Sequence, residues 1–354
     1  MVTKITILGC GISGMMAAAQ LPRNYEITIV AEHMPGDYDT KEWASPYAGA
    51  CWVGVHNSLP HEQKMQLEGF AGLWKLAHSN PESGARRIEM KEIMDLGAKE
   101  DVWYAGKLPD FRFLEDHELP AGARFGMTYK TVVISPQIFL SWLYSRLKDR
   151  GIKFVRIKVQ SLGELKGYGH DILINASGFG VQTLTDVREK HLIPMRMQTV
   201  VIKNNTYNRL FIRRGPNNYY STAFARMDGT VYVGGVLDPG ALTADGCRDL
   251  DTDLVIKPEQ RDHICRNAHL NQPDVFPSPN PKDWPILYDH VGVYPVLDRK
   301  VGGLRLEKEV LDGQRVIHVY GQIAGGYVYS FGQTRAVIEL VNDFLSEIPA
   351  SSKI

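Results

Sequence analysis

The chain has 354 residues, 44% of them apolar, and its 40 basic side chains equal its 40 acidic ones. This length is sufficient for a substantial core and two domains, and the balanced charge gives no indication of nucleic acid as a partner. No apolar run reaches the ~20 residues of a membrane span, and the N-terminus enters a strand at once, so we expect neither a signal peptide nor a membrane partner.

The first predicted elements are a strand, a glycine-rich turn and a helix. The strand runs into Gly9-Cys10-Gly11-Ile12-Ser13-Gly14, and an Ala- and Met-rich helix follows. Gly9 allows the tight turn, Gly11 lets a pyrophosphate approach the backbone, and Gly14 lets helix and strand pack closely. The helix N-terminus offers free N–H groups to phosphate. We therefore predict a dinucleotide site; a purely structural turn is the alternative.

The second strand, residues 26–30, ends on Ala31-Glu32. Glu32 lies where a carboxylate is needed to bind a ribose hydroxyl. The segment Ala44 to Trp52 follows and consists largely of small, uncharged residues. Small residues let the backbone approach a flat ligand, so this segment is predicted to contact the cofactor, with an ordinary buried loop as the alternative.

The middle of the chain alternates helices and strands. Apolar residues at helical spacing predict a core-packed helix over 60–80. A strand over 131–135 precedes a helix that starts with Pro136 and stops at Gly151. A strand over 151–159 and an apolar strand over 171–175 come next, and the latter is predicted to join the first two strands in a parallel sheet.

The second half changes character and then returns to the first pattern. Residues 196–240 contain four β-rich segments separated by turns, which predicts an antiparallel sheet, and a helix is predicted over 252–268. A strand then leads into a second Gly-rich turn over 321–326 and a long helix. A helix N-terminus aimed at a flavin would stabilise negative charge on it, so this second turn favours FAD over a nicotinamide cofactor.

These elements predict an α/β chain of two interleaved domains. A Rossmann-like FAD-binding domain comprises residues 1–55, 140–195 and 285–345. An antiparallel β-sheet substrate domain comprises 56–139 and 196–284, and residues 346–354 form a tail.

Several segments together resemble the D-amino-acid oxidase family, the FAD flavoenzymes that include D-aspartate oxidases, and fungal members most closely. The matching pieces are ITILGCGISG, ASPYAGACW, FVRIKV, INASGFG followed by PMRMQTVVIK, and HVYGQIAGGYVYSFGQ. They occur in the family's order over nearly the whole chain, and the family fold is the interleaved pair of domains just described.

The resemblance implies a noncovalent FAD site, since no His or Cys matches a pattern for flavin attachment. The residues implied to contact FAD, from pyrophosphate through ribose and adenine to the flavin, are Gly9, Gly11, Ile12, Ser13, Gly14, Glu32, His33, Ala44, Ser45, Gly49, Ala50, Cys51, Trp52, Val159, Ser177, Gly178, Gly325, Gly326, Tyr327 and Val328.

The implied reaction oxidises an α-C–N bond of a small-molecule amine. Hydride moves from carbon to flavin N5, water hydrolyses the resulting imine, and O2 is reduced to hydrogen peroxide. Positioning of the C–H bond and stabilisation of the flavin anion replace an obligatory side-chain base. A homodimer is one oligomeric state that the sequence allows.

The substrate end departs from the family pattern at two positions. The family binds the substrate carboxylate with an Arg, and here Tyr294 occupies that position. A phenol donates one hydrogen bond without charge, and losing the charge-assisted pair would cost on the order of 2–5 kcal/mol of binding. Thr222 stands where the family has a second carboxylate-binding Tyr, with Phe224 two residues on.

Several hypotheses follow from these departures. Another cation could replace the missing one, namely Arg213, Arg214, Arg226 or Arg299. Alternatively the substrate is a larger or less charged amine, held in an aromatic pocket of Tyr219, Tyr220, Phe224, Tyr294 and Tyr329, or is consumed in an oxidative cyclisation. A non-catalytic FAD-binding protein is a further alternative. The predicted substrate-pocket candidates are Tyr294, Tyr329, Thr222, Phe224 and Arg226.

The cysteines and the C-terminus bear on the compartment. Cys10, Cys51, Cys247 and Cys265 show no CxxC or metal-ligand spacing, so they are predicted to be reduced thiols in an intracellular protein without a metal site. The final Ser352-Lys353-Ile354 is close to a Ser-Lys-Leu address. This similarity favours a peroxisomal import receptor as partner, with a cytoplasmic location as the alternative.

Overall fold

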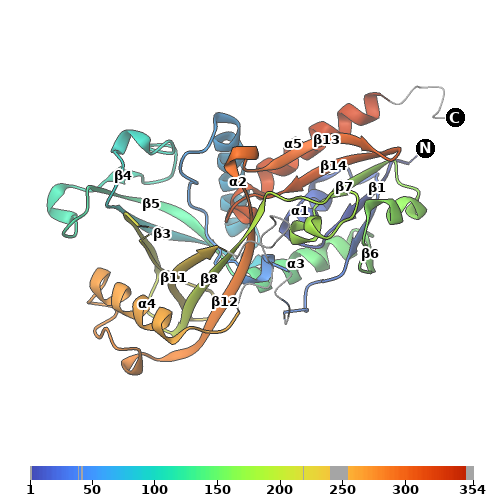
Figure 1. Cartoon of the computed structure of the whole chain (residues 1–354). Coiled ribbons are helices and arrows are strands. Elements are labelled where there is room, and N and C mark those ends of the chain that lie inside the picture. The colour runs from blue at the N-terminus through green and yellow to red at the C-terminus, as the bar shows by residue number, and fades with distance from the viewer. Residues whose placement is uncertain (1, 39, 41–42, 218, 240–253, 348–354) are drawn as a thin grey trace.

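The computed structural model describes residues 2–38, 40, 43–217, 219–239 and 254–347. The predicted targeting tripeptide and Cys247 lie outside these residues. Figure 1 shows two lobes, each built on its own β-sheet, with helices from both halves of the sequence packed between and around them. None of the helices in the described ranges is both long enough and apolar enough to cross a membrane.

The first lobe contains a six-stranded sheet in the order β13-β14-β7-β1-β2-β6. Neighbouring strands run parallel except β13, which pairs antiparallel with β14. Its strands are β1 (Lys4–Leu8), β2 (Glu26–Ala31), β6 (Lys153–Arg156), β7 (Ile172–Asn175), β13 (Arg305–Leu311) and β14 (Gln314–Tyr320). Because β1 pairs with both β2 and β7, the predicted grouping of the apolar strand at 171–175 with the first two strands is confirmed.

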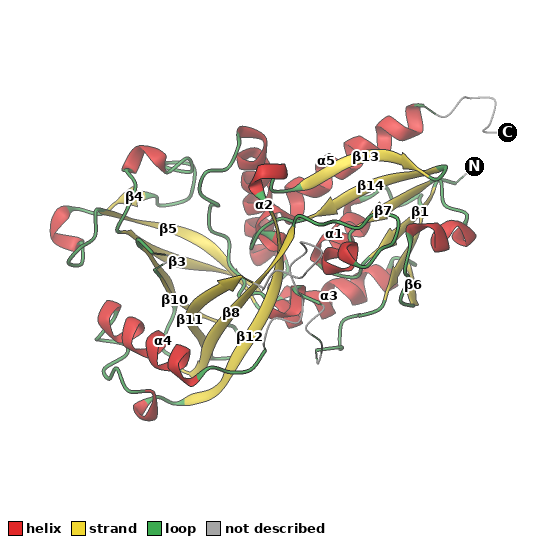
Figure 2. Ribbon diagram, viewed as in Figure 1, coloured by secondary structure: helices red, strands yellow, loops and turns green. Residues whose placement is uncertain are grey.

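Four helices lie beside this sheet or between it and the other lobe (Figure 2). They are α1 (Ile12–Gln20), α2 (Pro60–Ser79), α3 (Pro136–Asp149) and α5 (Gly326–Ser346). α5 packs on both α1 and α2. A Cβ at Gly69 would lie 1.9 Å from the Val328 oxygen, and one at Gly332 would lie 2.1 Å from the Met65 oxygen. The two glycines therefore allow α2 and α5 to touch through their backbones.

The second lobe contains an eight-stranded sheet in the order β12-β8-β11-β10-β9-β3-β5-β4. All neighbours are antiparallel except β3 and β9. Its strands are β3 (Ala85–Met94), β4 (Arg112–Phe113), β5 (Phe125–Ile134), β8 (Leu192–Lys203), β9 (Arg209–Arg214), β10 (Tyr220–Ala225), β11 (Thr230–Pro239) and β12 (Ile286–Leu297), and α4 (Pro258–Asn271) packs against β8, β10 and β11. The predicted antiparallel character of 196–240 is confirmed.

Several predicted boundaries differ from the structure. The strand expected over 131–135 is the end of a longer strand, β5, which begins at Phe125. Strand β12, placed with the FAD-binding segment 285–345, instead pairs along its whole length with β8 in the second sheet. The helix expected over 252–268 begins at Pro258, because a proline suits the first turn, where its missing N–H is not needed. The strand expected over 151–159 is confined to Lys153–Arg156, the residues that pair with β2.

Candidate functional site

A cavity of about 570 Å³ lies between the two sheets. One side is formed by the carboxyl ends of β1, β2, β7 and β14, and the other by β9, β10 and β12, with residues 43–56 running along it. Ligands of open parallel sheets bind at the carboxyl ends of the strands. The predicted nucleotide turn and the predicted substrate region therefore open into the same cavity.

The first glycine turn forms the nucleotide end of this cavity. A Cβ at Gly14 would lie 2.1 Å from the Gly9 oxygen, and one at Gly9, where φ is +110°, would lie 2.3 Å from the Ala176 oxygen. The N–H of Ile12, at the first turn of α1, donates to the Ser45 hydroxyl at 3.0 Å. This close backbone packing leaves the N-terminus of α1 at the cavity wall, where it can bind an anion.

The second glycine turn meets the first one. The side-chain amides of Gln322 and Gln333 donate to the Ser13 hydroxyl at 3.0 and 3.1 Å. The Tyr327 hydroxyl donates to the backbone carbonyl oxygen of Ser45 at 3.0 Å. Both helices that follow glycine turns, α1 and α5, thus begin at one cavity, as the resemblance implies for an extended FAD.

The nucleotide end also has polar groups suited to a phosphate and a ribose. The indole N–H of Trp43 is buried at the cavity and donates no hydrogen bond among the described residues. Glu32 lines the cavity beside Lys158, whose Nζ lies 3.1 Å from its carboxylate. An unpartnered buried donor, a helix N-terminus and a carboxylate at the end of β2 fit the pyrophosphate and ribose of FAD.

The structure brings most of the predicted FAD residues to this cavity. Those that line it are Gly9, Gly11, Ile12, Ser13, Glu32, His33, Ala44, Ser45, Gly49, Ala50, Cys51, Val159, Ser177, Gly178, Gly326, Tyr327 and Val328. Gly14, Trp52 and Gly325 are not in its wall. Gly14 packs on Gly9, and a Cβ at Gly325 would lie 2.6 Å from the Tyr329 ring.

Trp52 is fully buried in the core instead. Its Nε1 donates to the Gln66 oxygen of α2 at 2.9 Å, and its ring packs edge-on against Phe70. Tyr329 is likewise a core residue, whose hydroxyl accepts from the Gln66 amide at 3.0 Å. It points toward α2 because it lies on the face of α5 that packs there. Neither side chain lines the cavity.

Of the four arginines considered as replacement cations, only Arg214 lines the cavity. Its side chain is 28% exposed, and its Nε donates to the Glu92 carboxylate at 3.3 Å. Its guanidinium carbon lies 5.4 Å from the centre of the Tyr220 ring. Within the described part of the chain, Nη1 and Nη2 make no hydrogen bond, so both can serve a ligand.

Glu92 orients this guanidinium from the buried side. Its side chain is fully buried and accepts hydrogen bonds from the Tyr104 and Tyr129 hydroxyls at 2.8 and 3.0 Å, with the His56 Nε2 at 3.6 Å. Burial raises the pKa of Glu92, but His56 and Arg214 outweigh it and lower the pKa to about 2. The carboxylate therefore stays ionised and keeps Arg214 charged.

The other three arginines have structural partners. Arg213 lies 3.0 Å from both Asp95 carboxylate oxygens. Arg226 stacks over the Tyr232 ring with its guanidinium carbon 3.6 Å from the ring centre, and donates to the Ala48 and Gly49 oxygens. Arg299 pairs with Glu62 at 3.5 Å. None of the three lines the cavity.

The remaining substrate candidates are largely aromatic. Tyr220, Phe224 and Tyr294 line the cavity, whereas Tyr219 does not and accepts from the Asn271 amide at 2.8 Å. Tyr232, which the sequence did not single out, lines the cavity too. Thr222 also lines it, but its hydroxyl donates to the Phe211 oxygen at 2.9 Å. Burial raises the pKa of Tyr294, so it faces the cavity as a neutral phenol.

Sequence reasoning did not single out Glu92, His56, His290 or Trp43. His290 lines the cavity with Nε2 3.2 Å from the Tyr47 oxygen, and burial lowers its pKa to about 4, which keeps it neutral. Glu92 had one available signal, since it is a carboxylate on the buried face of strand β3. Buried carboxylates without a partner are rare, so its position indicates a nearby cation.

Comparison with known proteins identifies the family and the fold of the chain. A model of the family described as FAD dependent oxidoreductase matches residues 4–340. The chain is 27% identical to a D-amino-acid oxidase of Fusarium vanettenii, covering 97% of both chains. It is 28% identical to a D-aspartate oxidase of Talaromyces thermophilus, covering 96% of this chain and 95% of that protein. Glycine oxidase from Geobacillus kaustophilus has the same fold, with a TM-score of 0.72 at 14% identity over 97% of this chain and 95% of that one.

Proposed function

Because the chain belongs to the FAD dependent oxidoreductase family, we propose that it oxidises an amine whose anionic group is bound by Arg214. FAD held at the two glycine turns would supply the hydride acceptor, with O2 as the final electron acceptor. This proposal assigns the anion-binding role to β9 and leaves Tyr294, on β12, as part of an aromatic wall. It favours replacement of the missing family Arg by another cation.

The observation that carries the proposal is the unpartnered outer edge of the Arg214 guanidinium. Glu92 accepts from Nε, while Nη1 and Nη2 make no hydrogen bond within the described residues, and the side chain lines the cavity. Two parallel N–H groups of a guanidinium match a carboxylate. Tyr220 and Tyr294 flank the same end of the cavity and would exclude water from the bound substrate.

Binding at Arg214 fixes one end of the substrate, and the aromatic wall restricts the orientation of the other end. A charge anchor of this kind holds the carbon that carries the amine in one place, which is the main contribution a protein makes to hydride transfer. We propose noncovalent FAD, hydrogen peroxide as the second product and a peroxisomal or cytoplasmic location, in line with the sequence.

A second candidate substrate is a larger, less charged amine. Four aromatic side chains, Tyr220, Phe224, Tyr232 and Tyr294, line the same cavity, and aromatic walls favour cyclic or aromatic ligands over small ones. In this case Arg214 would contact a distal anion or remain unoccupied.

The test is flavin reduction without oxygen. Purified protein should be yellow, and its flavin absorbance should bleach with an amine that carries a carboxylate. The panel contains the D and L forms of alanine, aspartate and proline, and two amines that lack a carboxylate, ethylamine and pyrrolidine. Bleaching by the amines without a carboxylate at equal rates would contradict the role of Arg214, and no bleaching by any amine would favour a binding protein.

Tyr294 variants test the division of roles between the two sides of the cavity. Tyr294→Phe should lower kcat/KM for the best anionic amine by less than about tenfold, since a phenol contributes one neutral hydrogen bond. Steady-state oxygen consumption measures this. Tyr294→Arg, which adds a second cation at the cavity, should improve D-alanine turnover. A loss above a hundredfold in Tyr294→Phe would place the anion at Tyr294 instead.

A further inference from the structure

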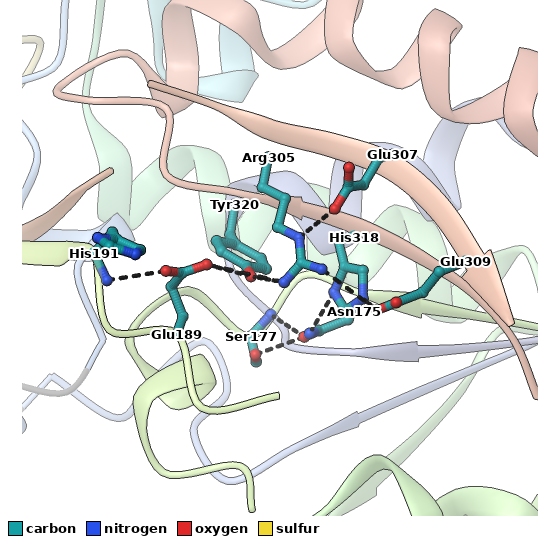
Figure 3. Close-up of polar contacts among 9 residues, drawn as sticks. All are labelled: Asn175, Ser177, Glu189, His191, Arg305, Glu307, Glu309, His318 and Tyr320. Atoms are coloured by element: carbon teal, nitrogen blue, oxygen red, sulfur yellow. Dashed lines mark hydrogen bonds and ion pairs between the residues drawn. The ribbon is translucent and has the colours of Figure 1, made fainter. Parts of the chain in front are cut away.

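A hydrogen-bond chain with a buried centre connects the outer edge of the six-stranded sheet to the cavity wall (Figure 3). His318 on β14 is fully buried, and its Nε2 lies 2.6 Å from the Glu309 carboxylate on β13. Its Nδ1 lies 3.1 Å from the side-chain amide nitrogen of Asn175, the last residue of β7. The Asn175 oxygen accepts from the Ser177 hydroxyl at 2.6 Å and from the Ser177 N–H at 3.3 Å.

Only one arrangement of protons satisfies every donor and acceptor in this series of hydrogen bonds. The Ser177 N–H can only donate, so it fixes the oxygen of the Asn175 amide on its side and the NH2 on the side of His318. Nδ1 of His318 must then accept, and Nε2 carries the proton that is donated to Glu309. The imidazole is therefore neutral in the arrangement that holds Ser177.

Ser177 and the next residue, Gly178, belong to the cavity wall. Gly178 has φ +58°, so the turn there is tight. Within the described chain the Ser177 hydroxyl and the Ser177 N–H both donate to the Asn175 oxygen. The Ser177 carbonyl also accepts from the Gly180 N–H at 3.0 Å. The position of the Ser177 hydroxyl and N–H therefore depends on the amide orientation, and through it on His318.

The charged groups around His318 include some that raise its pKa and one that lowers it. Burial lowers the pKa of His318, Arg305 on β13 lowers it further, and Glu309 and Glu307 on the same strand oppose this, with a net lowering. Tyr320 packs edge-on against the imidazole at 5.8 Å, and its hydroxyl accepts from Arg305 and donates to Glu189. The folded protein therefore favours the neutral form.

We propose that His318 is a positioning residue that holds the Ser177 turn in its cofactor-binding conformation only while its imidazole is neutral, so that FAD affinity falls in acid. A proton taken up from solvent at Nδ1 places two donors face to face. The Asn175 amide must rotate by half a turn to accept from Nδ1–H, and its NH2 then faces the Ser177 N–H. The Ser177 N–H loses its partner, and the turn is released.

Two substitutions test the roles of the two imidazole nitrogens separately. In His318→Asn the side-chain oxygen takes the place of Nδ1 and still accepts from Asn175, but it cannot titrate. In His318→Gln the amide takes the place of Nε2 and reaches Glu309, but Asn175 loses its acceptor. The readout is the dissociation constant of FAD from the apoprotein, measured by flavin fluorescence between about pH 5 and pH 8, with circular dichroism to check folding.

The wild-type FAD dissociation constant should rise by up to tenfold per pH unit on the acid side. His318→Asn should bind FAD like the wild type at pH 8 and lose that acid dependence, and His318→Gln should bind about threefold to tenfold more weakly even at pH 8. His33, His56 and His290, which also line the cavity, are intact in both variants. Unchanged acid dependence in His318→Asn, or wild-type affinity in His318→Gln, would overturn the proposal.

A third variant, at Glu309, tests whether the protonation of His318 controls FAD binding. Glu309, with 39% of its side chain exposed, favours the protonated imidazole through its charge. Glu309→Gln still accepts from Nε2, so neutral His318 keeps its partner, while protonation becomes less favourable. The pH at which half of the FAD is retained should shift downward, and an unchanged midpoint would contradict the proposal. None of these measurements depends on oxidase activity.

Discussion

Replacing Arg214 with glutamine should lower kcat/KM for an anionic amine by about a hundredfold to a thousandfold while the protein remains yellow. Arg214 places two unpartnered N–H groups at the cavity, and truncating one partner of a desolvated charge pair costs about 2–5 kcal/mol. The loss should appear mainly in KM, because the anchor binds the substrate before any bond changes. Anaerobic flavin reduction at several substrate concentrations gives the limiting rate and the apparent dissociation constant separately.

Two control variants keep this result interpretable. Arg214→Gln leaves the buried Glu92 carboxylate without its cation, so the double variant with Glu92→Gln restores neutrality and should show the same loss. Arg213→Gln removes the adjacent arginine of the same strand, which pairs with Asp95 outside the cavity. It should change stability but leave kcat/KM within about threefold, as expected for a residue that does not contact substrate. Equal losses in Arg213→Gln and Arg214→Gln would show that the effect is not local.

Gly14→Ala should yield a folded but colourless protein. The new Cβ would lie 2.1 Å from the Gly9 oxygen and 3.3 Å from Ile7, so the backbone of the first turn must move. Overpacking of this kind costs about 1–3 kcal/mol of folding free energy. A shift of the turn would also displace the N-terminus of α1, which is proposed to bind the pyrophosphate. Hydrogen bonds to charged groups contribute about 1.5–3 kcal/mol each, so FAD affinity should fall by about a hundredfold or more.

The matched control is Gly167→Ala, in the 3₁₀ segment Leu162–Tyr168, where an added Cβ meets no atom within 4 Å. This variant should retain FAD and unfold at the wild-type temperature. FAD affinity is measured by fluorescence titration of the apoproteins, and stability by thermal unfolding followed by circular dichroism. A Gly14→Ala protein that binds FAD like the wild type would exclude close packing of this turn as a requirement for the cofactor.

Local sequence determined the cofactor half of the molecule. The Gly9-to-Gly14 turn, the acid at Glu32 and the second turn before α5 each depend on residues adjacent in the chain, because a tight turn, a helix N-terminus and a strand end are local structures. The resemblance to the D-amino-acid oxidase family is confirmed by the family match over residues 4–340. The alternating segments of 196–240 were likewise sufficient to predict an antiparallel sheet.

Membership of a sheet and exposure to the cavity depended on the tertiary structure. Trp52 and Tyr329 lie in segments that reach the cavity, yet both side chains point into the core. Strand β12 follows the substrate-domain helix and precedes the strands of the first sheet, and its own sequence does not specify that β8 is its partner. Such pairings are set by hydrophobic surfaces and register contributed by distant strands.

The clearest case is the pair Arg213 and Arg214. Consecutive residues of a strand point to opposite faces, and the sequence alone did not indicate which of the two arginines faces the cavity. Which one was decided by the register of β9, which places Arg214 opposite Tyr220 on β10. The partner that holds the guanidinium, Glu92, comes from β3, 122 residues away in the chain. The sequence by itself determined the cofactor, since the turns and strand ends that indicate it are each local structures. Only the tertiary structure decided the substrate anchor, since an ion pair between distant strands exists only once the sheet has formed.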